Sequence, residues 1–420
     1  MDDQFLLDFY TQHERHAWIG TEPSFEMDVI DLKKCTNFRV NPQLHQQYDA
    51  VWFWQEALHE QHTFSWRIML DECIRLLKKD GYLIVRTRQS NQITIPMIKS
   101  FLWRNPNLKV SVFYEKCASA GFQLGEFNII FQIERLHFEC YQSKLWTFSM
   151  LTGGQRDENV VRFLKSIRDK DPEFKHEILI SGPQKELYAP YAVKYVDTSS
   201  IRENYAEIAR KKNLIAAAAT HPNLMIAHDR YWLSDTFFKD FEKYGYDFDF
   251  LAVKQLWDDG DEYPYYCFVY NNDLTWSYPV KSDNYQYLFN YYQYVNGGFT
   301  VVKTHSLKKI KFNDLLFWEQ MEDVELTQEF LKHSIIPRVN YLAHAVTAFD
   351  GTKRSQGFKM FDLFDGLKIW NFVQHANIGK LNNPLGLNKR NYIKKWVLKF
   401  TSRVIPMLNK LEQKWRSKPN

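Results

Sequence analysis

Two neighbouring carboxylates have a residue type and a position that could serve catalysis. Glu322 and Asp323 lie in FWEQMEDVEL and open a segment, VELTQEFLK, that is expected to be a helix. A carboxylate can remove the proton of a hydroxyl group that attacks a substrate. An acid in the first turn of a helix also interacts favourably with the helix dipole. The pair alone therefore leaves open whether it is catalytic or structural.

A third acid, Asp229, ends the segment PNLMIAHD, which is expected to be a strand. A carboxylate at a strand end could bind a hard divalent cation, since such ions prefer oxygen ligands. His228 could assist as a second ligand, and Arg230 could instead neutralise a phosphate directly. Asp229 could also simply cap the helix that follows. The sequence thus predicts a charged strand end and leaves the use of a metal open.

Strands and helices alternate in the region that would position these acids. The expected strands are LWTFSMLTGG (145–154), KHEILISG (175–182), YAVKYVD (191–197) and PNLMIAHD (222–229). The expected helices are ENVVRFLKSIRDK (158–170) and ENYAEIARKKNLIAAAA (203–219). This order predicts a doubly wound parallel sheet, which binds its ligands at the carboxyl ends of the strands.

The first 140 residues show the same alternation. QYDAVWFW (47–54) predicts a buried strand, WRIMLDECIRLLKK (66–79) an amphipathic helix, and Asp80-Gly81 a turn into the strand YLIVRT. EKCASAGFQLGEF (115–127) is expected to contain a helix and a glycine turn before the last strand, NIIFQIERL. The alternation indicates a mostly parallel sheet.

Residues 25–135 resemble the later half of a class I S-adenosylmethionine-dependent methyltransferase. The resemblance lies in YDAVWF, IMLDECIRLLKKDGYLIVRT and CASAGFQLGEF. The glycine-rich loop that such enzymes place after their first strand has no counterpart, because Gly20 is the only glycine before position 81. We therefore expect a degenerate domain that binds no S-adenosylmethionine and serves packing or partner binding.

Residues 145–346 resemble an inverting glycosyltransferase of the GT-A fold, of the family 2 or galactosyltransferase-like kind. The matching segments are FSMLTGGQRDENVVRFLKSI, EILISG, ARKKNLIAAAATHPNLMIAHDRYWL and NGGFTVVKTHSLKKIKFNDLLFWEQMEDVEL. In that family a Gly-Gly pair, a Phe-Asn and a Trp precede Glu-Asp in the last segment. The order and spacing of the segments carry the resemblance.

The resemblance implies roles for the residues singled out above. Asp323 is the expected base and Glu322 its acceptor-binding neighbour, and Gly297, Gly298 and Trp318 lie on the acceptor side. Chemistry requires both sites, because the departing diphosphate needs a positive partner and the acceptor hydroxyl must lose a proton.

The resemblance also implies a metal site and a nucleotide site. Asp229 matches the last acid of the family's Asp-x-Asp motif, although Ala227 replaces the first acid. His344 is an expected further ligand of a divalent Mn²⁺ or Mg²⁺. The expected nucleotide contacts are Thr152, Gly153, Gly154, Lys212 and Asn213. The first three could instead form a plain strand-to-helix turn, and the last two could lie on a solvated helix face.

Composition points to a soluble cytoplasmic protein with a basic tail. Five scattered cysteines suit a reducing compartment, no signal pattern opens the chain, and no apolar run approaches the 18 residues of a membrane span. Residues 388–420 carry a net charge of +9, whereas the whole chain carries +4. The rest of the chain is therefore acidic overall. Their cations interleave with apolar residues and Trp396, which favours an anionic membrane surface. A protein contact or nucleic acid would also explain the charge, but no known nucleic-acid motif accompanies it.

These observations together predict an α/β protein with two Rossmann-like domains and a C-terminal basic amphipathic helical tail. The expected boundaries are 1–140, 141–352 and 353–420. The expected function is transfer of a sugar, with inversion, from a nucleoside-diphosphate donor, UDP favoured, to a hydroxyl of a glycan or glycolipid in bacterial surface polysaccharide synthesis. The alternatives are an S-adenosylmethionine-dependent methyltransferase and a non-catalytic carbohydrate-binding or scaffold protein.

Overall fold

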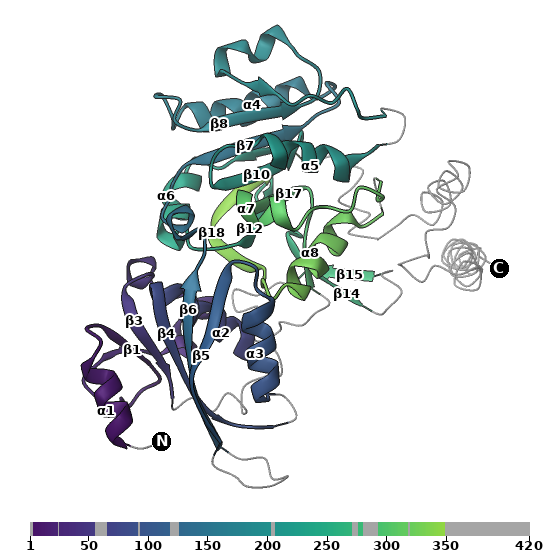
Figure 1. Ribbon diagram of the computed structural model, residues 1–420. Helices are drawn as coiled ribbons and strands as arrows, with labels where there is room; N and C mark the ends of the chain where they lie inside the picture. Colours follow the sequence, from purple (N-terminus) through teal and green to yellow (C-terminus); the bar gives the residue numbers. More distant parts are fainter. Residues whose placement is uncertain are drawn as a thin grey trace, which may run out of the picture. The chain divides into compact units, whose positions relative to one another are not determined.

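The chain is an α/β protein built on two large mixed sheets (Figure 1). The computed structural model describes residues 3–23, 25–54, 65–90, 93–117, 126–202, 206–270, 276–279, 293–317 and 320–348. Both sheets belong to one compact unit, which comprises residues up to 267 and from 279 to 350. Of the second unit, the structure describes only 268–270 and 276–278. No helix in the described ranges is long and apolar enough to cross a membrane.

The first sheet has six strands in the order β2-β1-β3-β4-β6-β5. Its strands are β1 His16–Ile19, β2 Asp28–Ile30, β3 Tyr48–Phe53, β4 Leu77–Arg88, β5 Leu108–Cys117 and β6 Glu126–Arg135. Strands β1 to β4 are parallel, whereas β6 is antiparallel to both of its neighbours. The helices that accompany the sheet are α1 Asp3–Thr11, α2 Ser65–Leu76 and α3 Ile95–Arg104. The prediction of a mostly parallel sheet is confirmed.

Two local predictions in this region were wrong. The expected turn at Asp80-Gly81 lies inside β4, where the register against β3 shifts between Tyr48 and Ala50. Gly81 fits there because an added Cβ would lie 3.0 Å from the Leu77 side chain and 3.2 Å from the Asp49 carbonyl oxygen. Residues 115–117, expected in a helix, continue β5, because pairing with β6 offers their backbone a sheet edge.

The second sheet has nine strands. Eight of them follow the order β11-β18-β12-β17-β10-β7-β8-β9, and β13 pairs with β12. Its strands are β7 Trp146–Leu151, β8 Glu177–Ser181, β9 Lys194–Tyr195, β10 Asn223–His228, β11 Tyr231–Leu233, β12 Phe250–Trp257, β13 Glu262–Tyr263, β17 Phe299–Lys303 and β18 Arg338–Thr347. Strands β7 to β10 are parallel, as the sequence predicts. β17 runs antiparallel between β10 and β12, so the sheet is mixed rather than parallel throughout.

Helices α4 Asp157–Arg168, α5 Ile208–Ala218, α6 Phe237–Tyr244, α7 Thr304–Lys309 and α8 Glu322–Lys332 accompany the second sheet. The remaining strands are β14 Tyr266–Tyr270, β15 Trp276–Pro279 and β16 Gln293–Val295. Short 3-10 turns span Leu32–Lys34, Thr36–Phe38, Pro42–Leu44, Phe138–Tyr141 and Glu186–Tyr191. The core of this half packs the apolar faces of α4 and α6 onto the sheet through fully buried residues such as Trp146, Phe163 and Phe241.

Buried ion pairs connect the two sheets inside the first unit. Arg75 of α2 donates to Asp247 (2.9 Å) and Asp249 (3.2 Å), which lie just before β12. Arg135 of β6 donates to both oxygens of Asp247 at 2.7 and 2.8 Å. The neighbouring guanidinium groups hold the pKa of Asp247 well below its usual range. These charged groups are buried away from water, so removing one partner would leave the other as an uncompensated buried charge and destabilise the fold.

Candidate functional site

The carboxyl ends of β7 and β10 bring Thr152 and Asp229 together. The two strands are parallel neighbours and pair Leu151 with His228, so the next residue of each strand lies at the same sheet edge. Thr152 Oγ1 donates to Asp229 Oδ2 at 3.0 Å, and Arg156 Nη1 donates to Asp229 Oδ1 at 3.0 Å. Both oxygens of the predicted metal ligand therefore accept a hydrogen bond.

The loop after β7 is a tight turn that needs its glycine. Gly154 has a φ of +78°, and an added Cβ would lie 2.6 Å from Pro183. Its backbone N–H donates to Thr152 Oγ1 (3.0 Å), and its carbonyl accepts from Lys185 Nζ (2.6 Å). Gly153 is exposed. The geometry explains Gly154 by the turn itself, and nucleotide binding by Thr152 and the two glycines stays a prediction.

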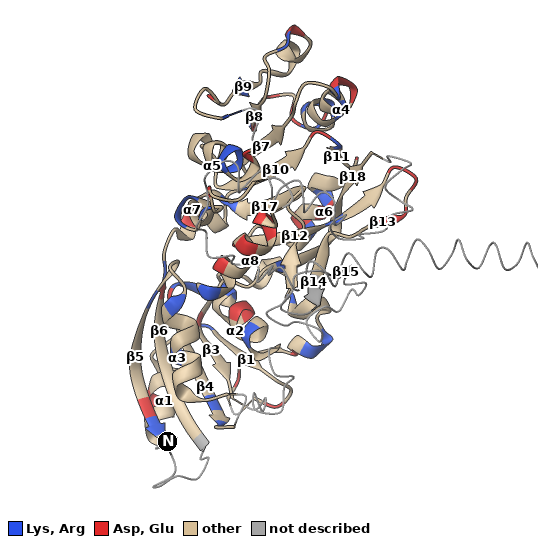
Figure 2. Ribbon diagram, turned by 90° about the vertical axis from the view of Figure 1, so that its right-hand side faces the viewer, with Lys and Arg blue, Asp and Glu red and all other residues tan. Residues whose placement is uncertain are grey.

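A second cluster forms around the start of α8, where Lys212 meets the acidic pair. Lys212 is fully buried on α5, and its Nζ lies 3.0 Å from Glu322 Oε1. The same Nζ donates to the Gly297 carbonyl oxygen at 2.8 Å. Figure 2 marks the acids of α8 in red and the cations of α5 in blue. The ion pair fixes the side chain of Glu322, whereas Asp323 has no ion-pair partner among the residues that the structure describes.

Asp323 is held against the turn that joins β16 and β17. The Gly297 backbone N–H donates to Asp323 Oδ2 at 2.8 Å, and Val324 N donates to Oδ1 at 2.9 Å. Burial and the neighbouring charge of Glu322 raise the pKa of Asp323 to about 6, against the opposing charge of Lys212. A carboxyl group with this pKa is ionised at neutral pH and is a stronger base than an ordinary aspartate.

The two clusters share the Gly297-Gly298 turn and so form one site. His228 N donates to the Gly298 carbonyl oxygen at 3.0 Å, which ties the end of β10 to the turn that holds Asp323. A Cβ added to Gly298 would lie 3.0 Å from Arg230 Nη2, and one added to Gly297 would lie 2.6 Å from the Asp323 Cβ. Both predicted acceptor-side glycines therefore lie where a side chain would collide with the site.

The side chains that follow β10 carry little compensating negative charge. Arg230 Nη2 donates to Tyr263 OH (2.9 Å) and Tyr231 OH (3.3 Å). Burial, followed by the charges of Lys212 and Arg230, keeps the pKa of His228 well below its usual range. His228 is therefore neutral, and its Nε2 is buried without a hydrogen-bond partner in the described part of the chain.

Two of the predicted site residues lie apart from these clusters. Asn213 Nδ2 donates to the Phe312 carbonyl oxygen at 2.8 Å, and its Oδ1 accepts from Phe312 N, so it holds the segment after α7. His344 lies within β18, and its charged neighbours are Asp240 and Lys254. Trp318 lies outside the described residues.

The residues present do not fit a divalent cation. Ala227 supplies no ligand, the charged neighbours of His344 are Asp240 and Lys254, and three cations lie near His228. In the described ranges, no three His, Cys, Asp or Glu residues gather in a way that could hold a metal ion. A metal at Asp229 would have to displace Arg156 and enter a region of positive charge, which Coulomb repulsion opposes.

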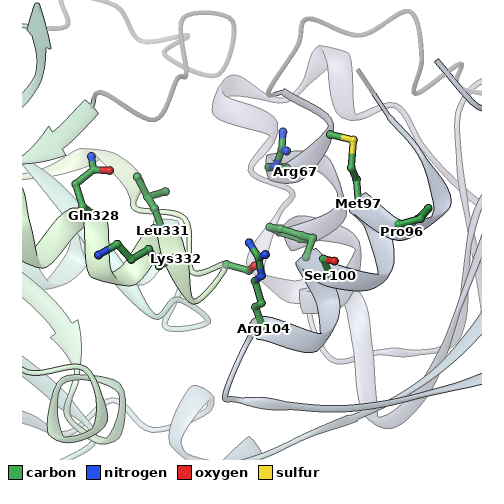
Figure 3. A pocket seen from close by; sticks show the side chains of 10 residues that line it. Arg67, Pro96, Met97, Ser100, Arg104, Gln328, Leu331 and Lys332 are labelled. Atoms are coloured by element: carbon green, nitrogen blue, oxygen red, sulfur yellow. The ribbon is translucent and has the colours of Figure 1, made fainter. Parts of the chain in front are cut away.

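A cavity of about 380 Å³ lies between the other half of α8 and the helices α2 and α3 (Figure 3). Gln328, Leu331 and Lys332 line it from α8, opposite Arg67 and Arg104. These α8 residues are more than one helical turn beyond Asp323, so the cavity is separate from the acidic cluster.

Sequence reasoning did not single out Arg156 or Tyr263. Arg156 stands two residues after Gly154, and that position beside a strand-end loop is a signal that could have identified it. Tyr263 comes from the β12–β13 hairpin, and nothing in its local sequence indicates that it would meet Arg230.

The chain matches no known family model and no curated protein. Among the solved structures that match it, the following two each cover about half of the chain. The crystal structure of S. aureus TarS 1-349 is 13% identical over 48% of this chain and 60% of its own, with a TM-score of 0.31. GalNAc-T7, solved with UDP, GalNAc and Mn²⁺, is 10% identical over 52% of this chain and 45% of its own, with a TM-score of 0.38. The chain thus spans less than two thirds of either structure.

Proposed function

We propose that this chain is a glycosyltransferase that moves a sugar from a nucleoside-diphosphate donor, UDP favoured, to a hydroxyl of a glycan or glycolipid. The observation that carries the proposal is the setting of Asp323. Its carboxylate accepts from the Gly297 N–H at 2.8 Å, has a pKa raised to about 6, and stands beside the locked Lys212–Glu322 pair.

The reaction is a single displacement with inversion. The acceptor oxygen forms a bond to the anomeric carbon while the bond from that carbon to the β-phosphate oxygen breaks. The electron pair of the broken bond stays on the diphosphate, and the acceptor proton passes to Asp323. Glu322, fixed by Lys212, holds the start of α8 and contacts the acceptor beside Gly297, Gly298 and Trp318.

The donor lies at the carboxyl ends of β7 and β10. Ligands of such sheets bind at strand ends, where the loops supply the contacts. Here the loop of Thr152, Gly153 and Gly154 faces the nucleoside, and Arg230 faces the diphosphate. The hydrogen bond from His228 N to Gly298 O ties the end of β10 to the Asp323 turn, and β7 pairs with β10. This arrangement would keep donor and base in one site.

The cellular setting that fits this chemistry is the cytoplasmic face of a bacterial membrane during surface polysaccharide synthesis. The basic segment 388–420 would bind anionic lipid there, each cation near the headgroups contributing roughly 1 kcal/mol. The segment lies outside the described residues. The domain formed by residues 1–140, methyltransferase-like in sequence, serves packing or partner binding.

A ligand panel tests the donor class without a known acceptor. Thermal unfolding of the full chain is measured with UDP, GDP, ADP and S-adenosylmethionine. A ligand that binds only the folded state raises the Tm by mass action, so UDP is expected to give the largest shift. A shift with S-adenosylmethionine alone would contradict the proposal and favour methyl transfer. No shift with any nucleotide would favour a non-catalytic protein.

A further inference from the structure

Arg230 is a cation without a counter-charge at the place where the donor diphosphate would lie. Its guanidinium donates to two tyrosine hydroxyls, those of Tyr263 and Tyr231. Over the ranges that the structure describes, no carboxylate pairs with it, and its Nε is buried without a hydrogen-bond partner. Because cations withdrawn from water are normally paired, this guanidinium is suited to an anionic ligand.

Arg156 brings a second guanidinium to the same strand ends. Its Nη1 lies 3.0 Å from Asp229 Oδ1, and its side chain is 48% exposed whereas that of Asp229 is 13% exposed. The carboxylate therefore anchors one edge of the guanidinium and leaves part of it open to solvent. Planar N–H groups of this kind match phosphate oxygens in a bidentate manner.

The contacts of the two guanidinium groups agree. In the described part of the chain, Arg230 has tyrosine hydroxyls and no carboxylate as partners. Arg156 pairs with Asp229, whose other oxygen accepts from Thr152. The strand end is therefore suited to an anion.

We propose that Arg156 and Arg230 neutralise the donor diphosphate and that transfer needs no divalent cation. The inference rests on the proposed glycosyltransferase function and concerns how that site stabilises its leaving group. When the anomeric carbon separates from the β-phosphate oxygen, the new negative charge faces the two guanidinium groups. Asp229 then positions Arg156 instead of holding a metal.

Calorimetric titration of the full chain with UDP, in EDTA and again in MnCl₂, tests the inference. The Kd values in the two buffers are expected to agree within about threefold. In EDTA, Arg230→Met and Arg156→Met are each expected to raise the Kd by about tenfold or more, since charge-assisted hydrogen bonds are lost. Asp229→Asn keeps an acceptor for Arg156 and is expected to change the Kd in EDTA by less than about threefold.

Two precautions keep the result decisive. Arg210→Met removes a cation on α5 whose side chain is 38% exposed and pairs with Glu207, and it should leave the Kd unchanged. If Arg230→Met does not fold, Arg156→Met decides, because that side chain is half exposed. UDP binding that requires Mn²⁺ and is lost in Asp229→Asn would overturn the inference and leave the transferase in place. No UDP binding in either buffer would count against the proposed function itself.

Discussion

At the scale of single residues, the site separates two acids that are adjacent in sequence. Glu322 is neutralised by a buried lysine, whereas the donors to Asp323 within the described ranges are backbone N–H groups. Burial and the charge of Glu322 disfavour the ionised form of Asp323, and this raises its pKa. We therefore predict that Asp323, rather than Glu322, accepts the proton of the substrate.

The pH profile of transfer tests the role of Asp323. The base acts only when ionised, so kcat/KM is expected to be full above the raised pKa of about 6 and to fall as the pH drops through it. Asp323→Asn is expected to lower kcat by about 10²- to 10⁴-fold. Its Tm at pH 8 should not fall, because burial penalises the charge that the substitution removes. A lowered Tm with unchanged kcat would mean that Asp323 is only a structural helix acid.

Glu322→Gln gives a matched control for the same profile. Removing the neighbouring negative charge is expected to lower the pKa of Asp323, so the acid limb of kcat/KM should move to lower pH. An acid limb that stays in place would show that another group limits the rate.

At the scale of elements, the turn between β16 and β17 is shaped to receive α8. Gly297 donates its N–H to Asp323, and its carbonyl oxygen accepts from Lys212, so the residue contacts both helices of the cluster. Met321, directly before α8, adopts a left-handed conformation with a φ of +61°. A non-glycine residue in this conformation destabilises the fold. The packing of α8 must outweigh that cost, and the conformation sets the angle at which the helix meets the turn.

Gly297→Ala is expected to misplace Asp323. The added methyl would lie 2.6 Å from the Asp323 Cβ and 3.1 Å from Lys212 Nζ, so the first turn of α8 must shift. A shift of this size in a positioned base is expected to lower kcat/KM by about 10²-fold while UDP still binds. Lys170→Ala, at an exposed position after α4, is the control. Equal activity in the two variants would contradict the predicted contact.

At the scale of the whole molecule, charged side chains replace apolar contacts where the two sheets of the first unit meet. Arg338 of β18 is completely buried, and its Nη1 donates to Asp71 (2.8 Å) and Glu72 (2.9 Å) of α2. Glu72 also accepts from Arg39, and Arg75 joins Asp71 to Asp247. The network links α2 to the edge of the second sheet and so ties the first 140 residues to the half that carries the site.

Arg338→Met is expected to destabilise the chain by about 3–5 kcal/mol, because it leaves Asp71 and Glu72 buried without this partner. Urea unfolding measures the loss. The control is Lys144→Met, whose ion pair with Glu242 has side chains 66% and 52% exposed and is expected to contribute less than about 1 kcal/mol. Equal losses in the two variants would contradict a structural role for the network.

Much of the architecture could be predicted from local pattern, and much of the site could not. Helix α4 and strands β7, β8 and β10 lie where the periodicity of the sequence predicts them, because burial of one face imposes that periodicity. The turn expected at Asp80-Gly81 instead lies within β4, since pairing with β3 and β6 outweighs the local preference of Asp-Gly. No local pattern indicates that β17 runs antiparallel, because strand direction depends on partners that are distant in sequence.

The sequence by itself determined which residues carry charge and which elements they begin or end. Asp229 at a strand end and Asp323 at a helix start follow from patterns that span a few residues. Only the tertiary structure decided that Lys212 pairs with Glu322, that Gly297 binds Asp323, and that Arg230 meets Tyr263. The reason is physical: local periodicity depends on nearest neighbours in the chain, whereas charge pairing and desolvation depend on neighbours in space.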